Sequence, residues 1–322
     1  MDALAHALAG IRLTSPLLAE LKIGGDVELS LGGKGSLTGS SPFHYVSSGA
    51  CRLLIGEDAF DLSQGDMIVL PHWPNYRLAT GTRGSSFDIL EVISEGRQPR
   101  WSPDAGLDTS LFLTLGEPPA VATLLSGIFV FEGSPGAFLL QALPALIHFR
   151  ADRTGMGELL EASLAFVGGD APGRPGYAAT ASRLLELLLV ETLRTWALTT
   201  PHMPGLLRGM VDPSLARVIY AIHSRPGLPW SLEEMSRIAG RSRSSFARHF
   251  ASIMGVTPAA YLLEWRCHLA ERRLAESDVS VAALAEELGY GSSFAFSRAF
   301  RSLRKVTPAG YRRRKRMAAG RE

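Results

Sequence analysis

The strongest constraint on the fold is an internal repeat near the end of the chain. One set of residues recurs at a displacement of 50, and a second set, just upstream, recurs at a displacement of 49. The one-residue difference falls after Gly240 in the first copy and after Gly289 in the second, where a turn is expected. A length difference confined to a turn indicates two copies of one supersecondary unit. The first set is Ser242, Phe246, Arg248, Phe250, Val256, Thr257, Pro258 and Tyr261, which return as Ser292, Phe296, Arg298, Phe300, Val306, Thr307, Pro308 and Tyr311.

Each copy has the pattern of a helix-turn-helix. A first helix places apolar residues on one face and ends at a glycine, and a serine can then cap a second helix. The second helix carries an inner aromatic pair, Phe246 and Phe250 in the first copy and Phe296 and Phe300 in the second. Two short helices joined by a glycine-containing turn are typical of this motif.

The outer face of each second helix contains no acidic residue. Small polar side chains allow such a helix to enter the major groove of DNA, where an arginine can reach the O6 and N7 atoms of guanine. An ordinary solvated surface can also be rich in arginine, but the occurrence of an acid-free face in both copies favours a DNA-binding surface. The face presents Ser244, Ser245 and Arg248 in the first copy, and Ser293, Phe294, Ser297, Arg298 and Arg301 in the second.

The segment between the two units is expected to form a connecting helix over 258–277, with Leu262, Trp265 and Leu269 on one side. A helix of about 20 residues spans about 30 Å at a rise of about 1.5 Å per residue. This length is close to the ~34 Å of one turn of duplex DNA. The spacing therefore predicts two recognition helices that enter successive major grooves.

Charge is distributed unevenly along the chain. From Arg208 onward, 20 Lys and Arg stand against 10 Asp and Glu, whereas the preceding part has 13 against 21. Most of the basic residues after Arg208 are arginines, whose planar guanidinium binds phosphate or guanine with paired hydrogen bonds. The asymmetry predicts that only the C-terminal part meets a polyanion, here double-stranded DNA.

The C-terminal part resembles the AraC/XylS family of bacterial transcription regulators over residues 212–314. The resemblance is carried by the paired helix-turn-helices, the connecting helix and the motif from Gly289 to Arg313, which contains Gly-Tyr-Gly-Ser-Ser-Phe and Val-Thr-Pro-Ala-Gly-Tyr. Relatives often have a larger side chain at the position of Ser244, so Arg243 or Arg248 is expected to contribute more in the first copy. The resemblance also implies activation through contact with RNA polymerase. The base contacts that it implies come from Ser244 and Arg248, and from Ser293, Phe294, Ser297 and Arg298.

Residues beside the recognition helices are expected to contact phosphates, which fix the register of a protein on DNA without reading its sequence. The run 312–316 is expected to form a flexible basic tail that adds salt-sensitive affinity, or one that serves solubility alone. The expected phosphate contacts are Arg241, Ser242, Ser292, Arg301, Arg304 and Lys305.

The N-terminal part has the pattern of a β-sandwich or barrel. Apolar runs at 27–31, 43–46, 51–55 and 67–70, with a later one at 126–131, are separated by turn residues. The segments 43–46 and 65–71 resemble the cupin-type sensor domain that precedes the DNA-binding module in many AraC/XylS relatives.

Cupin enzymes hold a metal with histidines and a carboxylate from two motifs. Here His44 is the one histidine of the first motif, Val46 stands where the next ligand would be, and Tyr76 replaces the histidine of the second. A histidine-based transition-metal site needs about three protein ligands, so we expect no metal, no other cofactor and no catalytic residue. The barrel then either holds a small effector lined by His44, Trp73 and Tyr76, or is simply filled by these side chains.

Helical patterning follows over 158–166 and 177–198. The second of these helices has more apolar surface than one small neighbour needs, which predicts a homodimer seam or packing on its own barrel. The expected organisation is a cupin-like sensor and dimerisation domain over 1–200, a linker over 201–211, and an all-α tandem helix-turn-helix DNA-binding domain over 212–316.

Two cysteines, Cys51 and Cys267, rule out a disulfide framework and a cysteine-based zinc site. The sequence has no apolar run of membrane-spanning length and no secretory signal pattern. These features favour a cytoplasmic protein in which Cys51 is a buried structural thiol.

Three functions compete for this sequence. A sequence-specific, effector-responsive transcription regulator explains both the repeat and the acid-free faces. A cupin-type enzyme of small molecules with a helical appendage needs metal ligands that the two motifs do not supply. A helical adaptor for an acidic protein explains the charge but not two recognition helices one duplex turn apart.

Overall fold

The computed structural model describes the chain in two compact units. We call them the β unit, residues 11–132 and 143–196, and the helical unit, residues 1–10, 133–142 and 197–322. The helix expected over 158–166 and residues 201–204 of the expected linker lie outside the described residues. The described residues are 4, 18–31, 40–81, 84–89, 92, 111–130, 133–150, 177–200 and 205–319.

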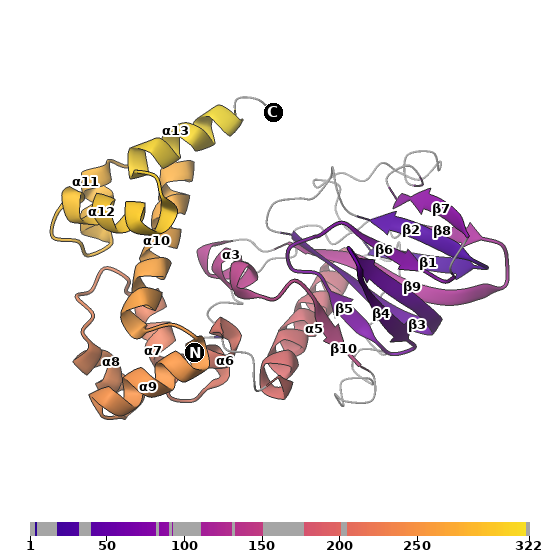
Figure 1. Ribbon diagram of the computed structural model, residues 1–322, viewed down its shortest axis with the longest axis horizontal. Helices are drawn as coiled ribbons and strands as arrows, with labels where there is room; N and C mark the ends of the chain where they lie inside the picture. Colours follow the sequence, from indigo (N-terminus) through magenta and orange to yellow (C-terminus); the bar gives the residue numbers. More distant parts are fainter. Residues whose placement is uncertain are drawn as a thin grey trace. The chain divides into compact units, whose positions relative to one another are not determined.

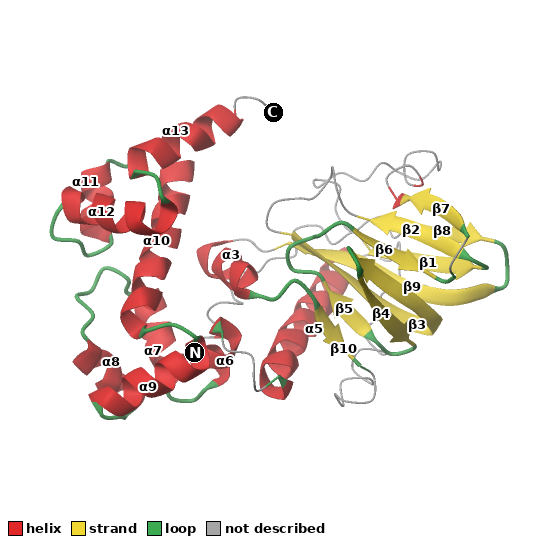
Figure 2. Cartoon of the chain, in the orientation of Figure 1, coloured by secondary structure: helices red, strands yellow, loops and turns green. Residues whose placement is uncertain are grey.

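The ten strands described in the β unit form a nearly closed barrel (Figures 1 and 2). The main path of paired strands runs β7-β2-β6-β3-β9-β1-β8, while β4 and β5 pair with β3, and β10 pairs with β5. The strands are β1 (Leu18–Gly24), β2 (Val27–Leu31), β3 (Ser40–Ile55), β4 (Asp58–Ser63), β5 (Met67–Val69), β6 (Tyr76–Ala79), β7 (Ser85–Asp88), β8 (Leu111–Gly116), β9 (Ala120–Val130) and β10 (Ile147–Phe149).

The long strand β3 joins the two parts of the barrel. Its first part pairs with β5 and β9, and its second part pairs with β4 and β6. The register shifts between Val46 and Ser48, and Gly49 follows with a φ of 76°. A Cβ atom on Gly49 would collide with the carbonyl oxygen of Val121, so only glycine fits at this bend. The runs 43–46 and 51–55, expected as separate strands, are therefore one bent strand.

Apolar side chains fill the barrel, and α5 (Tyr177–Thr199) lies beside β5 and β10 (Figure 2). Leu188, Leu189 and Leu193 of α5 are buried, and Thr192 lies 3.8 Å from the sulfur of Met67. One face of α5 therefore packs on its own barrel, while Leu187 stays exposed. Among the described helices, none is long and apolar enough to cross a membrane.

The helical unit contains the expected tandem helix-turn-helix. Helices α8 and α9 lie at one end of α10, and α11 and α12 lie at the other (Figure 1). The helices are α6 (Leu206–Val211), α7 (Leu215–Ser224), α8 (Leu232–Ala239), α9 (Arg243–Met254), α10 (Pro258–Glu276), α11 (Val281–Glu287), α12 (Ser293–Arg304) and α13 (Pro308–Ala319).

The sequence repeat is also a repeat of local structure. Residues 241–250 and 291–300 follow the same order of exposed, half-buried and buried positions. The N-cap serines predicted for α9 and α12 accept hydrogen bonds from the third amide of each helix. The glycines that end the first helix of each motif have φ angles of 68° and 74°, as a left-handed C-cap requires. These N-cap and C-cap residues are Ser242, Ser292, Gly240 and Gly289.

Each recognition helix packs its inner aromatic pair against a tyrosine of the following helix. The ring centroids lie 5.6 Å apart for Phe246 and Phe250 and 5.8 Å apart for Phe250 and Tyr261. The second copy has matching distances of 5.8 Å for both pairs. Its residues are Phe296, Phe300 and Tyr311.

Helix α3 (Gly133–Ala142) lies between β9 and β10 in the chain but packs in the helical unit. The ring of Phe138, which is buried, meets those of Trp265 and His268 at centroid distances of 5.0 and 5.1 Å. Its other ring neighbours are His223 of α7 and Tyr261 of α10. A segment inside the N-terminal part of the sequence thus completes the core of the helical unit.

The two copies end their recognition helices differently, which predicts a stabilising substitution. Gly255 follows α9 with a φ of 74°, and Lys305 follows α12 with a φ of 60°. A residue with a side chain pays about 1–2 kcal/mol for this left-handed conformation. We expect Lys305→Gly to raise the free energy of unfolding by about 0.5–1 kcal/mol, because glycine's greater flexibility when unfolded offsets part of the gain.

Denaturant titration followed by circular dichroism measures this difference. Gly255→Lys, at the equivalent position of the first copy, is the matched control and should lower the stability. Equal stability of Lys305→Gly and the unsubstituted protein would contradict the prediction.

Candidate DNA-binding surface

Helix α9 exposes a face that can enter a groove of DNA. Phe246 and Phe250 are fully buried, so Ser244 and Arg248 point the opposite way and are exposed. Arg243 is also exposed, but its Nη2 atom lies 2.5 Å from Oε2 of Glu233 on α8. Arg243 would have to leave this ion pair to read a base, whereas no described residue pairs with the side chain of Arg248.

Helix α12 exposes the equivalent face with a different composition. Ser293 and Arg298 are exposed and Ser297 is half-buried. Phe294 is 75% exposed, which excludes packing of its ring on the described part of its own domain. An exposed aromatic ring beside small polar residues suits contact with a thymine methyl group.

The two helix-turn-helix motifs are braced against each other. Arg266 of α10 donates from Nε to the carbonyl oxygen of Pro226, 2.9 Å away, and from Nη2 to that of Leu228, 2.8 Å away. Its guanidinium also lies over the ring of Tyr290, 5.3 Å from the centroid. One side chain thus connects the loop before α8 to the turn between α11 and α12, which limits independent movement of the two motifs.

Arg304, expected to contact a phosphate, has a different role. Its Nη2 atom lies 2.6 Å from Oε1 of Glu264, and its Nε atom lies 2.9 Å from Oε1 of Glu271. Burial would lower the pKa of Arg304, but the hydrogen bonds and charges of both glutamates outweigh it and raise the pKa above its ordinary value. Arg304 links the end of α12 to α10, so its guanidinium is engaged by two glutamates rather than free for a phosphate.

The other expected phosphate contacts are accessible. Arg241, Ser242, Ser292, Arg301 and Lys305 are all exposed. Ser242 and Ser292 accept a capping hydrogen bond through their side-chain oxygens, which leaves their hydroxyl protons and the free amides at the helix starts as possible phosphate donors.

The basic run 312–316 is not a flexible tail, because it lies within α13. Arg312 donates to the carbonyl oxygen of Val279, and Arg316 pairs with Asp278. Arg313, Arg314 and Lys315 remain exposed.

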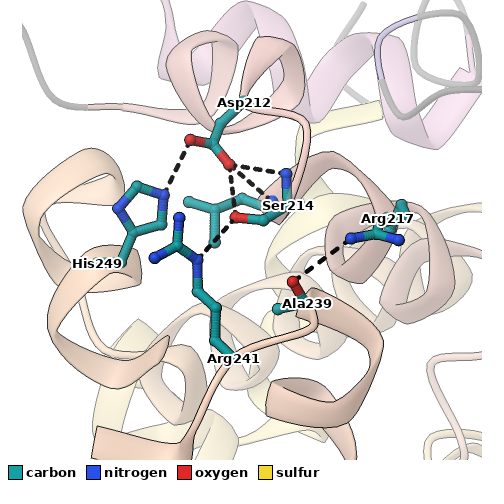
Figure 3. A network of polar contacts seen from close by, with 7 residues as sticks. Asp212, Ser214, Arg217, Ala239, Arg241 and His249 are labelled. Atoms are coloured by element: carbon teal, nitrogen blue, oxygen red, sulfur yellow. Dashed lines mark hydrogen bonds and ion pairs between the residues drawn. The ribbon is translucent and has the colours of Figure 1, made fainter. Parts of the chain in front are cut away.

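A polar network surrounds Asp212, between α6 and α7 (Figure 3). Its Oδ1 atom accepts hydrogen bonds from the amides of Ser214 and Leu215, both at 2.9 Å, and from the Ser214 hydroxyl at 2.8 Å. Its Oδ2 atom lies 2.9 Å from Nε2 of His249 on α9. Arg241, in the turn before α9, donates from Nε to the hydroxyl oxygen of Ser214 at 3.3 Å.

The charge of Asp212 is stabilised by these bonds. Partial burial acts to raise the pKa of Asp212, but hydrogen bonds from Leu215, Ser214 and His249 outweigh it and hold the pKa below its ordinary value. Sequence reasoning missed this network. An Asp-Pro-Ser sequence directly before an apolar helical run is an N-cap signal that could have identified Asp212, but its link to His249 is a tertiary contact.

The barrel brings two of the three expected pocket residues together. The Nε2 atom of His44 lies 2.7 Å from the hydroxyl oxygen of Tyr76, and its Nδ1 atom lies 2.6 Å from the hydroxyl oxygen of Ser126. All three residues are buried. Burial lowers the pKa of His44 to about 3 and raises that of Tyr76 above its ordinary value, so both are neutral at neutral pH. Trp73, half-buried, packs against the barrel core.

The described residues contain no cluster of His, Cys, Asp or Glu suited to a metal ion. Both cysteines are buried, and burial raises the pKa of each thiol to about 12. Reactive cysteines have a lowered pKa, so neither thiol has the properties of a redox sensor.

Comparison with known proteins matches both parts of the chain. A family model described as a cupin matches residues 2–197, and one described as a helix-turn-helix domain matches residues 235–314. The chain belongs to the AraC-type helix-turn-helix regulators that carry a cupin domain.

Two relatives match along nearly the whole chain. It is 29% identical to an AraC-like transcription regulator of Streptomyces lividans, covering 97% of this chain and 98% of the relative. It is 27% identical to the transcriptional regulator AlkR of Acinetobacter baylyi, covering 97% and 99%. The solved DNA-binding domain of AdpA, in complex with a target DNA, is 31% identical over 34% of this chain and 99% of that domain, with a TM-score of 0.33.

The ion pairs of Arg304 predict that its replacement destabilises the protein rather than its DNA contacts. Arg304→Met leaves Glu264 and Glu271 close together without their cation, and we expect the free energy of unfolding to fall by about 2–4 kcal/mol. Denaturant titration of the full chain measures the loss. Arg301→Met, at an exposed position of the same helix, should leave the stability within about 0.5 kcal/mol of the unsubstituted protein. An Arg304→Met protein of unchanged stability whose DNA affinity depends less on salt would restore the phosphate role.

Proposed function

We propose that this AraC-type regulator recognises specific promoter sequences by placing α9 and α12 in successive major grooves. The observation that carries the proposal is the matched pair of exposed, acid-free faces at the two ends of α10. A 19-residue helix spans roughly 28 Å, close to the ~34 Å between successive major grooves on one side of a duplex.

Base reading is divided unequally between the two helices. On α9, Arg248 is the main reader, with Ser244 allowing close approach and Arg243 restricted by Glu233. The reading residues of α12 are Ser293, Phe294, Ser297 and Arg298, and the phosphate contacts of both motifs are Arg241, Ser242, Ser292, Arg301 and Lys305.

A small-molecule effector bound in the barrel adjusts promoter occupancy by shifting the population of DNA-binding arrangements. His44, Trp73 and Tyr76 line its site. Support comes from Trp73, whose Nε1 atom is buried without a partner among the described residues, because a ligand oxygen that accepted this hydrogen bond would remove the penalty.

Helix α3 is the element that carries the signal. In the chain, α3 follows β9 and precedes β10, while Phe138 packs among Tyr261, Trp265 and His268 of α10. A change in strand positions on effector binding would therefore act on the helix that connects the two motifs.

The regulator works in the cytoplasm as a homodimer and activates transcription through RNA polymerase. The exposed Leu187 on the outer face of α5 supports a dimer seam there. Two buried free thiols fit a reducing compartment. The polymerase contact rests on the AraC/XylS resemblance.

The competing functions have less support. The Streptomyces lividans and Acinetobacter baylyi relatives, which match along nearly the whole chain, are described as transcription regulators, which favours the regulator over a cupin enzyme. An adaptor for acidic proteins gives no reason for the same exposed pattern to occur on both recognition helices.

Replacement of Arg298 tests base reading. Arg298→Ala should cost about 1–3 kcal/mol of binding free energy on the correct site and relax the preference at one base position. The measurement is fluorescence anisotropy with a site taken from genomic footprinting and its single-base variants. Arg301→Ala is the control and should weaken all sequences alike, lowering the slope of log affinity against log salt by about 0.9. Lost base preference in Arg301→Ala but not in Arg298→Ala would contradict the assignment.

Replacement of Phe138 tests the role of α3. Phe138→Ala removes a ring from the core of the helical unit, so we expect a loss of about 3–5 kcal/mol in stability and faster hydrogen exchange of backbone amides in α10. Hydrogen-exchange mass spectrometry of the full chain measures the latter. Leu187→Ala, an exposed position, should leave the exchange of α10 unchanged. If Phe138→Ala also left it unchanged, α3 would not be part of this unit in solution.

A further inference from the structure

The hydrogen bonds around Ser214 run in a fixed direction. Asp212 is ionised at neutral pH because its pKa is lowered, and a carboxylate can only accept hydrogen bonds. The Ser214 hydroxyl therefore donates its proton to Oδ1 of Asp212, 2.8 Å away. Its lone pairs remain to accept the Nε proton of Arg241, 3.3 Å away. Asp212 thus orients a serine, and the serine in turn orients an arginine.

Each of the two carboxylate oxygens of Asp212 has its own hydrogen-bond partners. The amides of Ser214 and Leu215 bind one oxygen, and His249 of α9 lies 2.9 Å from the other. Ser214 itself is 9% exposed, so its hydroxyl has little freedom to turn elsewhere. The chain of contacts is therefore anchored in the folded unit and ends at an exposed guanidinium.

Arg241 stands where a DNA phosphate would approach α9. It lies between Gly240, which ends α8, and Ser242, which caps α9. The start of a helix attracts anions through its free amide groups and its dipole. With Nε directed to Ser214, the two Nη groups have no partner among the described residues and can bind phosphate oxygens.

Fixing one end of this side chain has a physical benefit. A free arginine loses rotamer entropy when it is ordered, because its long side chain has several rotatable bonds. The hydrogen bond to Ser214 imposes part of this cost before DNA arrives, so less is lost on binding.

The second copy has no equivalent arrangement. The position of Arg241 is taken by Gly291, where an added Cβ would meet nothing within 4 Å, and the position of His249 is taken by Ala299. At position 291 itself, a phosphate contact in the second copy cannot come from a side chain. The first motif therefore has a positioned arginine before its recognition helix, and the second motif has none at the equivalent position.

We propose that Ser214, oriented by Asp212, is a positioning residue that holds Arg241 in place to bind a phosphate of the DNA backbone. This inference rests on the proposed function, because it concerns one of the phosphate contacts named there. It adds two residues that do not touch DNA to the DNA-binding machinery, and it assigns the stronger backbone anchor to the first motif.

A double-mutant cycle in the full chain tests the proposal, with a fluorescein-labelled duplex of mixed sequence and about 40 base pairs as the probe. Arg241→Ala should weaken binding and lower the slope of log affinity against log salt by about 0.9, the change for one phosphate. Ser214→Ala should weaken binding about 3- to 10-fold, the range that one hydrogen bond gives. In the Arg241→Ala background, Ser214→Ala should have no further effect.

The control is the same substitution combined with Arg301→Ala. Arg301 lies on α12, away from the network, so Ser214→Ala should again weaken binding about 3- to 10-fold in that background. A general loss of structure would weaken binding equally in every background, and that result would overturn the proposal. Should Ser214→Ala not fold, Ser214→Cys takes its place, since a thiol is a weak acceptor of similar shape.

Two different results separate the proposed DNA-binding function from the positioning role of Ser214. If the unsubstituted protein bound the duplex without any dependence on salt, the proposed DNA-binding function would be wrong. If it bound with the expected salt dependence but Ser214→Ala and Arg241→Ala had additive effects, only the positioning role would be wrong.

Discussion

The aromatic packing behind each recognition helix is the constraint on which the DNA-binding part depends. Phe246 and Phe250 turn one face of α9 inward, and their contact with Tyr261 joins α9 to the connecting helix. The second copy repeats this arrangement with nearly the same ring distances. Two buried rings fix the inner face of each helix, and the removal of either ring would cost several kcal/mol of stability. The polar face on the opposite side of the helix therefore points outward.

Polar contacts then determine how the two motifs act together. Arg266 connects the loop before α8 with the ring of Tyr290, and Arg304 connects α12 with two glutamates of α10. These contacts hold the two motifs in one geometry, and the loss of Arg304 would also leave two glutamates without their cation. A pair of recognition helices needs that geometry, because both must meet the same duplex at once.

The first motif differs from the second in its polar supports. Asp212 receives hydrogen bonds from the start of α7 and from His249 of α9, and through Ser214 it reaches Arg241. The second motif relies on Arg304 instead. The duplicated sequence therefore folds into two similar motifs whose attachments to the preceding helix use different chemistry.

Local patterns in the sequence determined the helices, their caps and the exposed faces of α9 and α12. Helical period, capping serines and glycine C-caps act within a few residues, so the repeat and the exposure of Arg248 and Arg298 could be predicted. Only the tertiary structure decided which charged groups are already paired. Arg304 looks like its exposed neighbour Arg301 in sequence, yet two glutamates of α10 hold it, because ion pairs depend on distance in space rather than on position in the chain. For the same reason, the place of α3 in the helical unit and the bend that makes one strand of β3 could not be read from local sequence.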